Sequence, residues 1–243
     1  MARTRVGFLQ GLLGSLPIVL AYFPVAVSFG VAAGKSGFSL AEAAFMSLVI
    51  YAGASQFLAI ALLAGGAGPL LAIVSLLTLN ARHLLYAPAL LQRVRRTESA
   101  RQIKVPWLWA HGLTDEVFAS ALGRLAMKDA RWTESWQVGM GIGAYLAWGS
   151  GTVVGALLGG GAFERWPAVD AALGFLMPTL FLSLLLAMVE KRHWPVVVTA
   201  VTVFAVGSAL FSASTGILLG MVAGGLVGML PGPATPQVVE GQP

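Results

Sequence analysis

The chain has 243 residues, of which 57% are hydrophobic and only 10% are charged. Its mean hydropathy is +0.81, and there are too few polar side chains to cover a water-soluble globule of this size. The composition excludes an ordinary soluble domain and predicts an all-α, polytopic membrane protein, with 1–243 as one transmembrane domain. Because there is no cysteine, disulfides and thiolate metal sites are also excluded.

The lengths of the apolar segments predict the membrane spans. Crossing about 30 Å of hydrocarbon takes roughly 20 helical residues, and the segments are too long and too continuous for the alternating strands of a barrel. The last segment is long enough for two spans, with a turn at 212–215. The uncharged segments are 7–33, 43–64, 138–162, 171–189 and 194 onward, and 68–91 is a further span that carries polar residues.

Residues 106–127 are the least typical segment, because they contain His111, Asp115, Glu116 and Arg124. If this segment crosses, the lysines and arginines of the loops divide equally between the two sides, whereas a non-crossing segment puts eleven on one side and three on the other. Basic residues in short loops mark the cytoplasmic side. We therefore expect seven full crossings, a cytoplasmic C-terminus, an external N-terminus, and a fourth segment that is re-entrant or enclosed in the bundle.

A weak internal repeat has an offset near 125 residues, which aligns Gly30 with Gly155 and Gly34 with Gly159. The segments 7–92 and 138–211 are then candidate repeat halves. A non-crossing fourth segment would make them an inverted pair, a common transporter plan. Composition alone also explains such a match, because spans rich in glycine and alanine resemble one another.

Two spans contain residues that favour interruptions. Pro17 and Pro24 each remove a backbone hydrogen bond in the first span, which indicates kinks or a broken helix. In the second span, 51–57 place small and polar residues in the middle, which suits close helix packing or a discontinuous helix that lines a site. We predict that four residues surround one cavity and contact substrate: Pro24, Ser55, Gln56 and Asn80.

Ionisable residues occur in the third and fourth segments. Arg82 lies on a connected helical arc with Asn80 and His83, which we expect at the same substrate site. An arginine in a span either anchors the bundle or serves function. A carboxylate at membrane depth must be paired, protonated or hydrated. Asp115 and Glu116 therefore predict proton coupling helped by His83, or a structural ion pair with Arg82.

Other functional classes have less support. The sequence contains no G-x-S-x-G, H-E-x-x-H or P-loop motif, although an intramembrane hydrolase that uses Ser55 and His83 is an alternative. A channel would need rings of charge or repeated filter loops. Six tryptophans near span ends predict an interfacial belt: Trp107, Trp109, Trp132, Trp136, Trp166 and Trp194.

Several motifs in order resemble the AzlC-type branched-chain amino acid exporters. The resemblance covers about residues 7–190, and its strongest parts are Gly-Ala-Ser-Gln and Asn-x-Arg-His. Ala26 departs from the pattern, since glycine is expected two residues after the proline. The matching positions are Gly14, Pro17, Pro24, Phe29, Gly30, 51–57, 80–83, 114–116, Trp148, Gly155, Asp170 and Phe181.

The resemblance implies a secondary transporter that exports leucine, isoleucine, valine or other hydrophobic amino acids across the inner membrane. It also implies a small AzlD-like membrane subunit as partner, with no cofactor and no nucleic acid. Broken helices are compatible with this role, because they can present amide groups to a carboxylate and carbonyl groups to an ammonium. A permease or channel-like scaffold for another small metabolite is the alternative.

Overall fold

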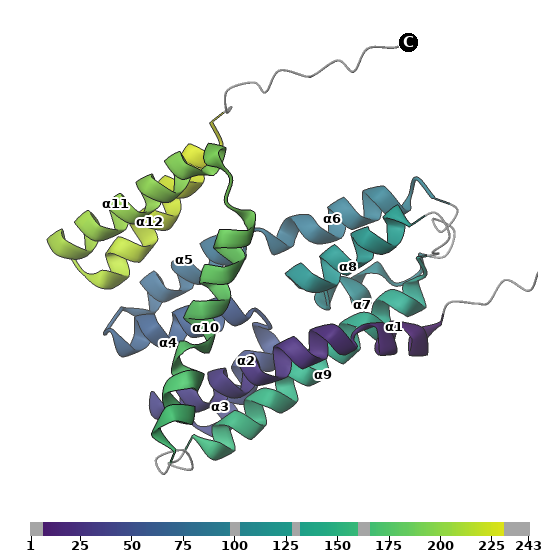
Figure 1. The fold of residues 1–243 in the computed structure, drawn as a ribbon, viewed down its shortest axis with the longest axis horizontal. Helices are drawn as coiled ribbons and strands as arrows, with labels where there is room; N and C mark the ends of the chain where they lie inside the picture. Colours follow the sequence, from purple (N-terminus) through teal and green to yellow (C-terminus); the bar gives the residue numbers. More distant parts are fainter. Residues whose placement is uncertain (1–6, 98–102, 128–131, 160–165, 231–243) are drawn as a thin grey trace, which may run out of the picture.

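The computed structural model describes residues 7–97, 103–127, 132–159 and 166–230. Within these ranges the regular elements are all helices (Figure 1), which confirms the predicted all-α class. Six basic residues used in the charge count lie outside the described residues: Arg3, Arg5, Arg101, Lys128, Arg131 and Arg165. The side chains of Asp170 and Phe181 are likewise outside the description.

The chain forms twelve α-helices and a short 3₁₀ helix within the described ranges. Local sequence sets several helix starts: a capping box joins Ser39 and Glu42, and the Thr133 side chain accepts from the Trp136 amide. The helices are α1 (Phe8–Gly14), α2 (Leu16–Lys35), α3 (Leu40–Val49), α4 (Gly53–Ala64), α5 (Pro69–Asn80), α6 (His83–Val94), α7 (Pro106–His111), α8 (Asp115–Ala126), α9 (Glu134–Leu158), α10 (Pro167–Met188), η2 (Lys191–His193), α11 (Trp194–Leu210) and α12 (Ala213–Gly228).

Helices α1 and α2 pack along α9 and run in the same direction (Figure 1). Gly11 lies against Trp136 near the start of α9, and Gly30 lies against Gly155 near its end. The absence of a Cβ at the glycines lets the two backbones approach closely. Because α2 and α9 are parallel, they are not related as an inverted repeat of 7–92 and 138–211 requires.

Residues 43–64 do not form the single crossing expected from the sequence. The Gln56 amide donates to Ser47 Oγ at 3.0 Å, and Ala43 and Ile60 share one buried cluster with Phe29 and Ala33. Two collinear helices would hold these positions far apart, so α3 and α4 form a hairpin that opens toward the end where α2 and α9 finish. The reversal occurs at Tyr51, which has a positive φ of 43°.

Helices α5 and α6 form one long interrupted element, Pro69–Val94. Helix α5 returns beside α4, and the interruption lies at Ala81 and Arg82, beyond which α6 continues toward the other end of the bundle (Figure 1). There Leu90 and Val94 join the buried cluster that surrounds the start of α9.

Residues 106–127 form a second hairpin, which enters from the end opposite to the first. Trp109 of α7 bonds to Glu134, and the Arg124 guanidinium of α8 lies 4.6 Å from the Trp136 ring centre. Both arms therefore reach the same end of α9. Helices of 6 and 12 residues are also too short to cross hydrocarbon singly. This arrangement agrees with a non-crossing fourth segment.

The first described residues lie at the end that the basic loops share, because Gly11 lies beside Trp136. This position differs from the external N-terminus expected from the charge count, since a hairpin at 43–64 removes one crossing. Basic residues at this end include Arg93, Arg95, Arg96, Lys104 and Arg124, and Lys35 ends α2 at the other.

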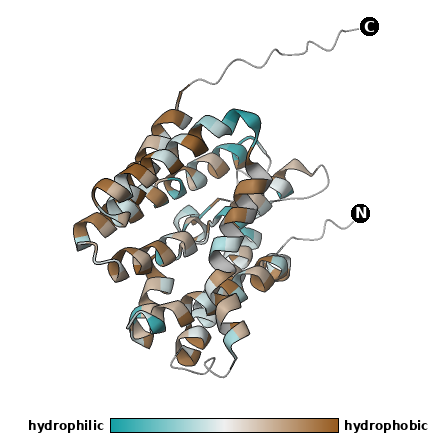
Figure 2. Ribbon diagram, turned by 60° about the vertical axis from the view of Figure 1, so that its left-hand side comes forward, coloured by the Kyte–Doolittle hydropathy of each residue, from teal (hydrophilic) through white to brown (hydrophobic). Residues whose placement is uncertain are grey.

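Four elements are long and apolar enough to cross a membrane by length and composition: Leu16–Lys35, Pro69–Val94, Glu134–Leu158 and Lys191–Leu210. Apolar residues occur along most of the helices (Figure 2). Large side chains such as Leu20, Leu70 and Leu84 are 75–78% exposed, which suits contact with lipid tails.

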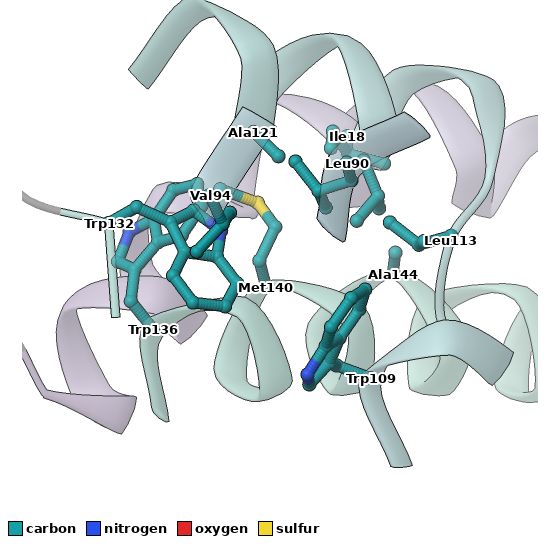
Figure 3. Close-up of a cluster of buried hydrophobic side chains, with 11 residues drawn as sticks. Ile18, Leu90, Val94, Trp109, Leu113, Ala121, Trp132, Trp136, Met140 and Ala144 are labelled. Carbon is teal, nitrogen blue, oxygen red and sulfur yellow. The ribbon is translucent and has the colours of Figure 1, made fainter. Parts of the chain in front are cut away.

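Tryptophans build the core at the basic end (Figure 3). Trp109, Trp132 and Trp136 are at most 4% exposed, which corrects their assignment to an interfacial belt, because the α7–α8 hairpin covers the start of α9. The indole groups of Trp109 and Trp132 donate to Glu134 and Gln137. Trp107, Trp166 and Trp194 are 54–72% exposed, as a belt position requires.

Candidate functional site

A cavity of about 100 Å³ lies where the tips of the two hairpins meet α2, α9 and the interruption between α5 and α6. It brings together segments that are far apart in sequence, and it combines charged, aromatic and aliphatic side chains. The lining residues are Ala21, Tyr22, Val25, Tyr51, Ala52, Gly53, Ala54, Arg82, His83, Thr114, Asp115, Glu116 and Trp148.

The first hairpin contributes the start of α4 to this cavity. Ala52 is the N-cap and makes no side-chain capping bond with any described residue, so the first N–H groups of α4 lack helical partners. The preceding Tyr51 ring packs against Tyr145 at 4.8 Å and His111 at 6.1 Å between ring centres. The His111 contact joins the tips of the two hairpins directly.

The second hairpin contributes the start of α8, which carries its own negative charge. The Thr114 hydroxyl caps the helix by accepting from the Val117 amide at 3.4 Å. Asp115 and Glu116 occupy the first turn, where the helix dipole favours carboxylates. The Tyr86 hydroxyl donates to Asp115 and the Tyr22 hydroxyl donates to Glu116.

Arg82 and Asp115 form an ion pair of 2.9 Å, with side chains 43% and 42% exposed. The sequence predicted such an ion pair with Arg82 as the alternative to proton coupling. At this exposure it contributes only about 0–1 kcal/mol to stability. Glu116 differs from Asp115, because no cationic partner contacts it within the described parts of the chain.

Gln56 lies behind the cavity wall, where it is fully buried and belongs to a chain of side-chain hydrogen bonds. It accepts from the Trp148 indole at 2.8 Å and donates to Ser47, which in turn bonds to Thr152 at 2.6 Å. These hydrogen bonds hold the first hairpin against α9 and orient the Trp148 ring, which lines the cavity.

Ser55 and Asn80 also lie behind the lining residues. The Ser55 hydroxyl donates to Asn80 Oδ1 at 2.6 Å, so it joins α4 to the end of α5. A hydrolase would need Ser55 bonded to a base such as His83, and the hydroxyl is bonded to Asn80 instead.

The predicted site residues therefore occupy two layers. Arg82, His83, Asp115 and Glu116 line the cavity. Ser55, Gln56 and Asn80 support its wall through hydrogen bonds. Pro24 is exposed within a continuous α2 and is not among the lining residues, whereas Tyr22 and Val25 are. Pro17 lies in the first turn of α2, directly after the break at Ser15 that separates α1 from α2, whereas α2 continues through Pro24.

Two residues of this region were missed from the sequence. Tyr22 donates to Glu116, and a lone phenol between two prolines was the available signal. Buried Glu134 accepts from the Lys104 and Val105 amides and the Trp109 indole, so it anchors the second hairpin. The sequence feature that could have identified Glu134 is a carboxylate placed directly before an apolar span.

One buried polar atom of a residue that lines the cavity, the Tyr51 hydroxyl, has no hydrogen-bond partner among the described residues. Buried polar groups in folded proteins are nearly always bonded, so this hydroxyl indicates room for a polar ligand. Among the described side chains, no group of three His, Cys, Asp or Glu could hold a metal ion.

The chain is similar to several membrane proteins. It is 42% identical to the inner membrane protein YgaZ of Escherichia coli over 92% of this chain and 90% of that protein. It is 38% identical to a membrane protein of Archaeoglobus fulgidus, over 90% and 93% of the two chains. It is 26% identical to the branched-chain amino acid transport protein AzlC of Bacillus subtilis, over 74% and 68%.

No solved structure matches the chain. The model of the AzlC protein family matches residues 17–161, which include both hairpins and every residue that lines the cavity. The match covers more than half of the chain, and the chain therefore belongs to the AzlC protein family.

Proposed function

We propose that this membrane transport protein exports branched-chain or other hydrophobic amino acids across the inner membrane, with protons as the coupling ion. The cavity between the hairpin tips is the observation that carries the proposal. Arg82, Asp115 and Glu116 supply charges for an amino-acid backbone. Val25 and Trp148 supply an apolar wall for its side chain. The name of the Bacillus relative supports this substrate class.

Glu116 is the proposed proton carrier. Asp115 is already bonded to Arg82 and Tyr86, whereas Glu116 accepts only from the Tyr22 hydroxyl among the bonds of the described residues. A carboxylate without a fixed cation can hold either a proton or the substrate ammonium. If the two compete for Glu116, proton entry drives amino-acid exit.

The two hairpins are the proposed gates. They enter from opposite ends and meet at Tyr51 and His111. Withdrawal of one tip would open the cavity to one side while the other tip keeps the opposite side closed, as alternating access requires. A small AzlD-like membrane protein is the proposed partner of the complete transporter.

The test is leucine export from cells that express the chain alone, the small partner alone, both, or neither. Cells are loaded with labelled leucine and efflux is followed at two external pH values. We expect faster efflux with the chain and partner together, and a further increase when external pH is lowered. Efflux equal to that of cells lacking the chain, for leucine, isoleucine and valine, would refute the proposal.

A further inference from the structure

The start of α4 and the Tyr51 hydroxyl form a candidate anion site within the cavity. Helix α4 has 12 residues, and its first N–H groups are not capped by Ala52. Gly53 and Ala54 both line the cavity. The N-terminus of a helix carries partial positive charge and free donors, which suit a carboxylate.

The Tyr51 hydroxyl is an independent sign of a ligand. Tyr51 lines the cavity and is only 7% exposed, and its hydroxyl has no partner in the described structure. The residue is also held at φ 43°, a conformation that a bulky side chain rarely adopts. A phenol O–H here can donate to an anion that the N–H groups of α4 hold.

The other helix start that lines the cavity carries the opposite charge. The start of α8 is already capped by Thr114 and carries Asp115 and Glu116. The start of α4 therefore suits an anion, and the acidic start of α8 suits a cation. An α-amino acid carries its carboxylate and its ammonium on one carbon, and the aromatic and aliphatic residues that also line the cavity leave a place for its side chain.

We propose that the α-carboxylate of the transported amino acid binds to the N–H groups at the start of α4 and to the Tyr51 hydroxyl, so that the protein selects substrates with a free carboxylate. This inference rests on the proposed function, and it assigns the orientation of the substrate. Leucine binds, whereas leucinamide and isoamylamine, which keep the side chain and amine, do not.

The test measures binding of these three compounds to the purified protein with its partner, alongside leucine efflux. Tyr51→Phe should weaken leucine binding by about tenfold or more, the loss expected for a hydrogen bond to a charged group. The matched control is Tyr145→Phe, because Tyr145 packs on the same ring but donates to the Leu48 carbonyl. It should bind leucine like the parent.

A second pair of variants tests the backbone donors. Gly53→Pro removes one N–H at a position where proline suits a helix start, whereas Gly53→Ala keeps it. The proline variant should lose more leucine affinity than the alanine variant; equal losses would mean that bulk, not the N–H, is responsible. Leucinamide binding as tightly as leucine in an active exporter would overturn the carboxylate assignment alone. Absence of both leucine binding and efflux would instead overturn the proposed function, and this inference with it.

Discussion

Gly30 of α2 and Gly155 of α9 lie directly against each other, so that a Cβ added to Gly30 would come within 2.8 Å of the Gly155 carbonyl carbon. The close approach continues at Gly34, whose added Cβ would lie 3.6 Å from Gly159 Cα. These are the glycine pairs that the offset of 125 residues aligned. The sequence match thus coincides with a contact between two parallel helices.

A larger side chain in this close contact between α2 and α9 should destabilise the protein. Gly30→Ala forces α2 away from α9, and overpacking of this kind costs about 1–3 kcal/mol. Thermal unfolding in detergent should show a lower midpoint than the parent. Gly225→Ala is the control, because a Cβ at Gly225 on α12 meets nothing within 4 Å. Equal unfolding midpoints for the two variants would contradict the close packing of α2 against α9.

The hairpin at 43–64 makes a clear topological prediction. The chain has no cysteine, so single cysteines can be introduced at Ser36 and Gly68, which flank the hairpin. Both should react with an impermeant maleimide added outside spheroplasts, whereas cysteines at Arg96 and Met127 should react only after permeabilisation. If Ser36 and Gly68 reacted from different sides, the segment would cross and the hairpin would be wrong.

Glu116→Gln should remove the dependence of export on external pH, because the amide cannot carry a proton. Counterflow of leucine at saturating concentration needs no net proton movement and should survive. Asp115→Asn is the comparison: it removes the ion pair with Arg82 but should keep the pH dependence. The assignment fails if Glu116→Gln retains the pH profile of the parent.

Gln56→Leu and Asn80→Leu should each weaken transport while membrane insertion is preserved. Leucine at 56 leaves the Trp148 indole without a partner and removes one of the two hydrogen bonds of Ser47, which keeps Thr152. Leucine at 80 leaves the Ser55 hydroxyl without its partner. Each unpaired buried group costs about 1–3 kcal/mol. Efflux kinetics and the amount of protein in the membrane fraction are measured together. If both variants kept the efflux kinetics of the parent, the hydrogen bonds of Gln56 and Asn80 behind the cavity wall would not be needed for transport.

Glu134→Gln should loosen the second hairpin, since the carboxylate accepts two backbone amides and one indole N–H. A glutamine NH₂ group would face one of these donors, and the expected loss of stability is about 1–3 kcal/mol. Thermal unfolding followed by tryptophan fluorescence reports it, because Trp109 is one of the partners. Ser135→Ala, on the exposed side of the same turn, should leave the midpoint unchanged.

Hydropathy and charge were enough to predict an all-α membrane protein and the unusual 106–127 segment. They did not show the reversal at Tyr51, because an apolar hairpin and an apolar span have the same composition. The reversal depends on one residue with positive φ, and a tyrosine carries no signal for that conformation. Because 43–64 was counted as a crossing, the N-terminus was expected on the side opposite to the basic loops.

The charged half of the site was easier to predict than its aromatic half. Arg82, His83, Asp115 and Glu116 stand out in an apolar sequence, since each ionisable group in a span is unfavourable unless it is used. Tyr22 and Trp148 are common core residues, and only the meeting of distant segments gives them a role at the cavity. Pro24 was a misleading signal, because α2 continues through it.

Both hairpins are fastened to α9, the first through Ser47 and Thr152 and the second through Glu134. Their tips also touch each other at Tyr51 and His111. Substitutions in one hairpin therefore change the surroundings of the other, although the two lie far apart in sequence. Their energetic effects should be non-additive, so that evolutionary change at one tip is expected to require compensating change at the other.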